Sequence, residues 1–129
     1  MTLDDYRNNL LPSERRLFDE FVDIGIVKTI YALLDAKVDD LVIKRVVTTH
    51  WSISSDEFID IFTHARIDAA LELLWEHLRL MGFTESQANA FLNANAIEKR
   101  LFHNHELLKY WNNPEKLFKA VQQKKKNKE

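Results

Sequence analysis

The chain has 129 residues, of which 46% are hydrophobic and 29% are charged, and its formal net charge is −2. It has no cysteine, which excludes disulfides, thiol catalysis and cysteine-ligated metal sites. There is no apolar run of about 18 residues and no basic-then-apolar start, so we expect no membrane span, no secretory signal and a cytoplasmic location.

Helix-breaking residues are scarce. Only two glycines and two prolines occur, and no alternating run bounded by turn residues indicates a strand. The sequence therefore predicts an all-α fold. At this length we expect a single-domain bundle of about six helices over residues 1–123. Residues 124–129 are predicted to form a basic, disordered tail.

Charge is divided unevenly along the chain. Residues 1–60 carry 7 basic and 12 acidic side chains, hence −5, whereas residues 61–129 carry 11 and 8, hence +3. The tail alone contributes +3, from Lys124, Lys125, Lys126 and Lys128 against Glu129. The body without the tail is therefore acidic, and it does not attract phosphate backbones over its whole surface.

The first part of the chain predicts a short helix followed by a long one. Thr2 with Asp5 is a cap for a helix over residues 3–9. The long helix covers residues 13–35, with Gly25 as the place for any bend. We expect its apolar residues to face inward in two groups: Leu17, Phe18, Phe21 and Val22, then Ile26, Val27, Ile30, Tyr31 and Leu34.

The middle of the chain contains a long stretch without a helix breaker. We expect a helix over residues 38–50, a turn, and then Ser54 with Glu57 as the cap of the next helix. Residues 55–81 contain neither glycine nor proline and form either one helix or two. The apolar stripe loses phase at residues 63–66, which favours a break there.

The clearest helical pattern lies at the end of this stretch. One helix face carries large apolar residues with Trp75 at its centre: Leu71, Leu74, Trp75, Leu78 and Met81. Gly82 suits the left-handed residue that ends a helix, and Phe83 can fold back on the closing turn. Thr84 with Gln87 is a capping box for the following helix.

Two further helices are expected towards the C-terminus. Asn93 and Asn95 indicate a break, and residues 97–111 are predicted to form a single helix with Leu101 on its buried side. Asn113 and Pro114 then begin the last helix, because proline is favoured at the first helical position.

A period of 30 residues connects several of these helices. Two sets of large residues coincide at this offset: Leu41, Leu71 and Leu101, and Trp51, Met81 and Trp111. Stacked helical hairpins would produce such a period, and the three leucines would then occupy equivalent buried sites. Ordinary amphipathic helices of similar length would also align in this way, so both interpretations stay open.

The tight turn contains a short motif with a known counterpart. It consists of Leu80, Met81, Gly82 and Phe83, followed by Ala88, Phe91 and Leu92. This motif resembles the loop of ubiquitin-associated domains, which are three-helix bundles, over about 15 residues. The pattern after Asn95 departs from that family because it leads into a longer helix, so neither fold nor function is carried over.

The residues that could carry chemistry do not form a recognisable site. His64 has Asp60 and Asp68 four residues to either side, so the three share a helix face, as ligands or as a solvated polar face. No HExxH pattern, GxSxG turn or glycine-rich phosphate loop occurs. We therefore expect no enzymatic activity, no catalytic residue, no metal and no cofactor.

One segment has the dimensions of a DNA-binding motif. Residues 41–66 could form a helix-turn-helix, but acids open the second helix, where bases and phosphates would lie: Asp56, Glu57 and Asp60. We expect a non-enzymatic protein-interaction or regulatory module whose partner is another protein. The alternative is an accessory nucleic-acid-binding protein that uses the basic C-terminal part, through Lys124, Lys125, Lys126 and Lys128. The oligomeric state stays open.

Overall fold

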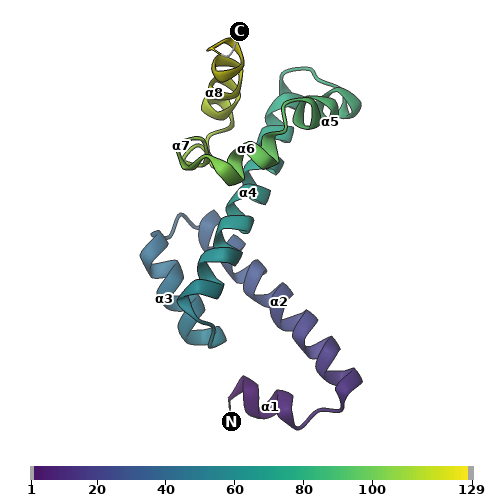
Figure 1. Cartoon of the computed structure of the whole chain (residues 1–129), viewed down its shortest axis with the longest axis vertical. Helices are drawn as coiled ribbons and strands as arrows, with labels where there is room; N and C mark the ends of the chain where they lie inside the picture. Colours follow the sequence, from purple (N-terminus) through teal and green to yellow (C-terminus); the bar gives the residue numbers. More distant parts are fainter. Residues whose placement is uncertain (1, 128–129) are drawn as a thin grey trace. The chain divides into compact units, whose positions relative to one another are not determined.

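The computed structural model describes the backbone of residues 2–127 and the side chains up to Gln123. Within these residues all regular structure is helical, which confirms the all-α prediction (Figure 1). The helices are α1 (Leu3–Asn8), α2 (Pro12–Asp35), α3 (Asp40–Trp51), α4 (Ser55–Leu80), α5 (Glu85–Ala94), α6 (Ile97–His103), α7 (His105–Leu108) and α8 (Pro114–Asn127).

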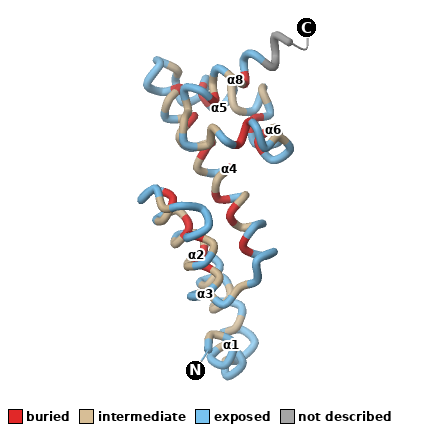
Figure 2. Tube along the Cα trace, turned by 90° about the vertical axis from the view of Figure 1, so that its left-hand side faces the viewer, coloured by how far each residue is buried: buried red, intermediate tan, exposed pale blue. Residues whose placement is uncertain are grey.

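The chain divides into two compact units, Met1–Phe62 and Thr63–Glu129. The first contains α1, α2, α3 and the beginning of α4, and the second contains the rest of α4 with α5 to α8. Buried residues, red in Figure 2, occur in both units. The expectation of one domain over residues 1–123 stays a prediction.

The core of the first unit lies where α3 packs along the C-terminal half of α2 (Figure 1). Its buried side chains are Ile26, Ile30 and Leu34 of α2, Ile43 and Val47 of α3, and Phe58 and Phe62 of α4. Every buried residue of α2 thus follows Gly25 in the sequence. No residue of the N-terminal half of the helix is fully buried.

Gly25 is a point of very close approach between α2 and α3. A Cβ atom on Gly25 would lie 2.5 Å from Cη2 of Trp51 and 3.0 Å from its Cζ2. The indole N–H of Trp51 donates to Thr29 Oγ1 (3.2 Å), and that hydroxyl donates to the Gly25 carbonyl (2.7 Å). The indole therefore occupies the space of a side chain at position 25. This packing explains a glycine inside a helix, where it costs about 1 kcal/mol relative to alanine.

The second unit is organised around the C-terminal part of α4. Its core is a cluster of buried side chains: Ile67, Ala70, Leu74, Leu78, Ala88, Ile97, Leu101, Leu107, Leu108, Leu117 and Val121. The prediction that Trp75 is central to the stripe is wrong. Leu74 and Leu78 are fully buried, whereas Trp75 is half-buried beside them. The indole N–H of Trp75 instead donates to Asn89 Oδ1 at the surface (3.0 Å).

The turn after α4 forms as the sequence predicts. Gly82 has a φ of 102°, in the left-handed region that favours glycine. The Phe83 N–H donates to the Leu78 carbonyl (3.0 Å) and the Gly82 N–H to the Arg79 carbonyl (3.1 Å), which are the two bonds of a Schellman motif. Phe83 packs back against the core.

Side-chain oxygens cap the helix starts that the sequence indicates. In each case the oxygen accepts a hydrogen bond from the N–H three residues ahead, at Thr2, Ser54, Thr84 and Asn113. At Thr84 the box is reciprocal, because Gln87 Oε1 accepts from the Thr84 N–H (2.9 Å). These local predictions are confirmed.

The predicted break in α4 at residues 63–66 is wrong. α4 is one continuous helix from Ser55 to Leu80. The apolar pattern changes phase because the buried residues before this point, Phe58 and Phe62, belong to the first unit, whereas those from Ile67 onward pack in the second. A loss of phase therefore marks a change of core here, and without a glycine or proline the helix continues.

The predicted single helix over residues 97–111 is also wrong. α6 ends at His103, and Asn104 takes an extended conformation (φ −135°, ψ 98°). Its side-chain oxygen accepts from the Leu107 N–H (3.2 Å) and so begins the short helix α7. A capping asparagine in the middle of the pattern is the sequence signal for this interruption.

The 30-residue period does not place its leucines in equivalent sites. Leu101 is fully buried and Leu71 is half-buried, but Leu41 is 76% exposed in the first turn of α3. The prediction of three equivalent buried sites is therefore wrong. In α3 the residues that face the core are Ile43 and Val47.

Substituting Gly25 tests the contact between α2 and α3. Gly25→Ala should destabilise the protein by about 1 kcal/mol, because overpacking costs about 1–3 kcal/mol and the better helix propensity returns about 1 kcal/mol. In a Trp51→Leu background the same substitution should stabilise the protein, since the clash is gone. Urea unfolding followed by circular dichroism measures both effects. The same sign in both backgrounds would contradict this assignment.

A pair of neighbouring substitutions tests the core of the second unit. Leu74→Ala should lower the free energy of unfolding by about 2–5 kcal/mol, the cost of a cavity in a closed core. Trp75→Ala should cost less, about 1 kcal/mol, because Trp75 packs at the edge of this core and is only half-buried. Denaturant unfolding of the two variants compares them directly, and a larger loss for Trp75 than for Leu74 would refute this order.

Candidate functional site

The N-terminal half of α2 exposes a row of large apolar side chains. Leu17 is 56% exposed, Phe21 70% and Ile24 51%. The prediction that Leu17 and Phe21 face inward is therefore wrong, although Phe18 and Val22 of the same group are half-buried. We call Leu17, Phe21 and Ile24 the α2 stripe.

Helix geometry explains why the α2 stripe and the core cannot coincide. At 3.6 residues per turn, Phe21 and Ile26 point about 140° apart around the axis. Leu17, Phe21 and Ile24 are spaced by four and three residues, so they lie on one face. Ile26, Ile30 and Leu34 lie on another, which packs in the core. α2 thus has two apolar faces, and the fold uses one of them.

Helix α1 covers a different side of α2. The Tyr6 and Phe18 rings lie 5.4 Å apart between centroids. Arg7 donates from Nε and Nη2 to the two carboxylate oxygens of Asp19, at 2.7 and 2.9 Å. Hydrogen bonding to Arg7 lowers the pKa of Asp19, and the same bond raises the pKa of Arg7. These contacts attach α1 beside Phe18 and leave Phe21 exposed.

Charged side chains of opposite sign lie at the two ends of the α2 stripe. Glu14 is one turn before Leu17, and Lys28 is one turn after Ile24, and both are exposed. Glu14 Oε1 accepts the Leu11 N–H at the start of the helix (2.9 Å). An acidic residue therefore lies before the α2 stripe on this helix face, and a basic residue lies after it.

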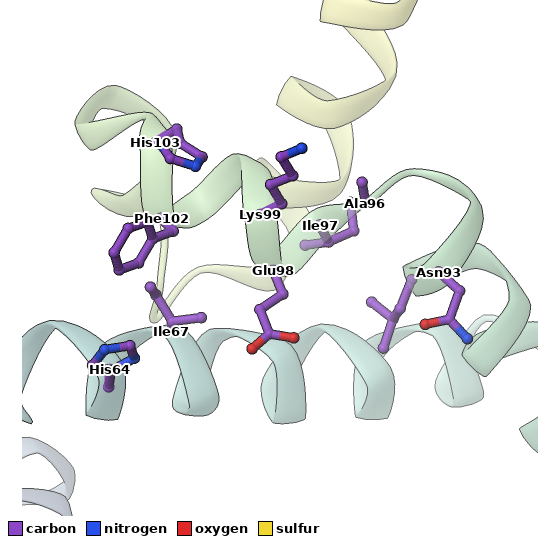
Figure 3. Close-up of a pocket in the computed structure, with 10 residues that line it drawn as sticks. His64, Ile67, Asn93, Ala96, Ile97, Glu98, Lys99, Phe102 and His103 are labelled. Carbon is purple, nitrogen blue, oxygen red and sulfur yellow. The ribbon is translucent and has the colours of Figure 1, made fainter.

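The second unit has a hollow of about 400 Å³ between α4 and α6 (Figure 3). Figure 3 shows Phe102 of α6 directed towards His64 and Ile67 of α4. The His64 and Phe102 rings lie 5.7 Å apart between centroids, and Phe102 also meets His103 edge-on at 5.2 Å. Aromatic contacts thus account for the position of Phe102, which is 48% exposed.

The sequence singled out one helix face of α4 and four lysines near the C-terminus as candidate site residues. Within residues 2–123, no three His, Asp or Glu side chains are grouped so that they could hold a metal ion, and this includes the helix face of Asp60, His64 and Asp68. The backbone of residues 124–127 continues α8. The side chains of Lys124, Lys125 and Lys126, and all of Lys128, lie outside the described residues.

Sequence reasoning missed the α2 stripe although its signal is present. Glu14, Phe21 and Lys28 are seven residues apart, as are Leu17 and Ile24, which is the spacing of a helix face that meets another helix. This second periodicity overlaps with the core periodicity of the same helix. Both sets of residues therefore resemble a single interior face in the sequence.

The character of the helices and the comparisons with known proteins complete the description of this chain. None of the helices within residues 2–127 combines the length with the apolar character that crossing a bilayer requires. Comparison with protein families, with curated proteins and with solved structures finds no match for this chain.

Proposed function

We propose that this chain is a non-enzymatic protein-interaction or regulatory module that binds another polypeptide through the α2 stripe. The observation that supports this proposal is the exposure of Leu17, Phe21 and Ile24 on one face of a helix whose opposite face is in the core. Contiguous exposed apolar surface is typical of protein contact sites.

Burial of the α2 stripe would supply the free energy of binding. Complete burial of a leucine, isoleucine or phenylalanine side chain contributes about 1.5–3 kcal/mol. Phe21 is the natural anchor, since aromatic side chains dominate the energetics of interfaces and it is the most exposed of the three.

The spacing of the α2 stripe favours a helical partner. Residues that recur at intervals of four and three along a helix present a narrow apolar row, which is the surface that a second amphipathic helix covers. The first unit carries a net charge of −5 over residues 1–62, since residues 61 and 62 are uncharged. Such a surface favours a polypeptide ligand over a polyanion.

Crosslinking at the stripe tests the proposed function. A photoreactive residue at position 21 of the full chain should form adducts with protein in the native cell lysate, and nuclease treatment should not remove them. The matched control is position 80, because Leu80 is 88% exposed but lies in the second unit. Equal adducts at both positions, or none at position 21, would contradict the proposal.

Removal of the basic end separates this proposal from nucleic-acid binding. Deleting residues 124–129 removes four lysines and one glutamate and changes the net charge from −2 to −5. Adduct formation at position 21 should be unchanged, because the deleted residues contain no apolar side chain. A nucleic-acid-binding protein would instead lose affinity and show a flatter dependence on salt, which a mobility-shift titration measures.

A further inference from the structure

We infer that the partner of the α2 stripe is a second copy of this chain, bound with the two α2 helices antiparallel. This inference rests on the proposed function and specifies the polypeptide that the stripe binds. It follows from the order of residues along one exposed helix face, which we call the row: Glu14, Leu17, Phe21, Ile24 and Lys28.

The spacing of these five residues is that of a helix–helix seam. Glu14, Phe21 and Lys28 repeat every seven residues, and Leu17 and Ile24 repeat at the same interval between them. Two helices that pair through such positions interlock their side chains along the whole row. The three central residues are each more than half exposed, so this row is open to a partner.

The row of one chain can also pair with the same row of a second chain. A symmetric dimer uses the same patch on both copies, so residue i of one meets residue j of the other and the reverse. With the two-fold axis between Phe21 and Ile24, Phe21 packs against the partner's Ile24, and Leu17 lies opposite the partner's Lys28. Phe21 and Ile24 at the centre of the row then cover each other in both copies.

Charge at the ends of the row selects the antiparallel orientation. In a parallel pair, Glu14 would meet the partner's Glu14 and Lys28 the partner's Lys28, so both ends would repel. In the antiparallel pair, Glu14 lies within one helical turn of the partner's Lys28 at each end. In many helical dimers, repulsion between like charges disfavours the wrong orientation of the two helices in this way.

The remainder of the first unit does not block this pairing. α1 is attached beside Phe18 through Tyr6 and through the Arg7–Asp19 ion pair. α3 packs at Gly25 and beyond, on the side of Ile26 and Ile30. Neither contact covers Phe21. The carboxylate of Glu14 uses Oε1 for the Leu11 N–H, and its second oxygen can face a lysine of the partner.

Charge reversal in the full chain tests the inference. The wild type should form dimers in a concentration-dependent manner in sedimentation velocity. Lys28→Glu and Glu14→Lys should each weaken the dimer by roughly tenfold, because both ends of the row then repel. The double variant Glu14→Lys/Lys28→Glu should restore the dimer, because a lysine of one copy again lies near a glutamate of the other at each end. Leu80→Gln is the control and should leave the dimer unchanged.

Disulfide trapping gives a second readout if a charge variant fails to fold. The chain has no cysteine. An equimolar mixture of Leu17→Cys and Lys28→Cys chains should form a crosslinked heterodimer on oxidation, whereas neither chain alone should crosslink efficiently. Crosslinking within each single variant, but not between them, would indicate a parallel pair and overturn the inference.

The outcomes also separate this inference from the proposed function. A wild type that stays monomeric up to about 1 mM would overturn self-association. If adducts at position 21 then contain another polypeptide, the proposed function stands without the dimer. If position 21 gives no adduct with any protein, both are refuted. A dimer that is insensitive to both single reversals would also overturn the α2 pairing.

Discussion

Trp51 contacts α2 at the only residue of that helix without a side chain, and this contact decides which face of α2 enters the core. Because an α-helix is rigid over a few turns, docking the indole at Gly25 fixes the rotation of the whole helix. Ile26, Ile30 and Leu34 then point inward, and Phe21 points outward. The hydrogen bonds from Trp51 to Thr29 and from Thr29 to the Gly25 carbonyl hold the indole in this position.

Features that depend on a few neighbouring residues could be predicted from the sequence. The caps at Thr2, Ser54 and Thr84 and the left-handed Gly82 are set by hydrogen bonds within one turn, so the chain encodes them locally. The choice between two apolar faces of α2 is not local. It depends on where Trp51 docks, 26 residues after Gly25, and no periodicity within α2 contains that information.

The same limit explains why the sequence alone does not reveal the candidate site. Leu17 and Phe21 are large and apolar, which predicts an interior position, but an exposed apolar residue is common in folded proteins. Only the contiguity of Leu17, Phe21 and Ile24 on one exposed face makes them informative, and contiguity at the surface requires the fold. Glu14 and Lys28 at the ends of the row can be seen in the sequence. They indicate a contact surface only once the row between them is known to be exposed.

The continuity of α4 has a consequence for how the chain folds. Starting a helix is unfavourable, whereas extending an existing helix by one residue is not. Phe58 and Phe62 are stabilised by one core, and Leu74 and Leu78 by the other, within a single hydrogen-bonded helix. The core that forms first therefore stabilises a helical segment of α4, and this segment can be extended into the other core without a new nucleation step. We expect the folding kinetics of the two units to be coupled through this helix, so that a destabilised core slows the formation of its neighbour.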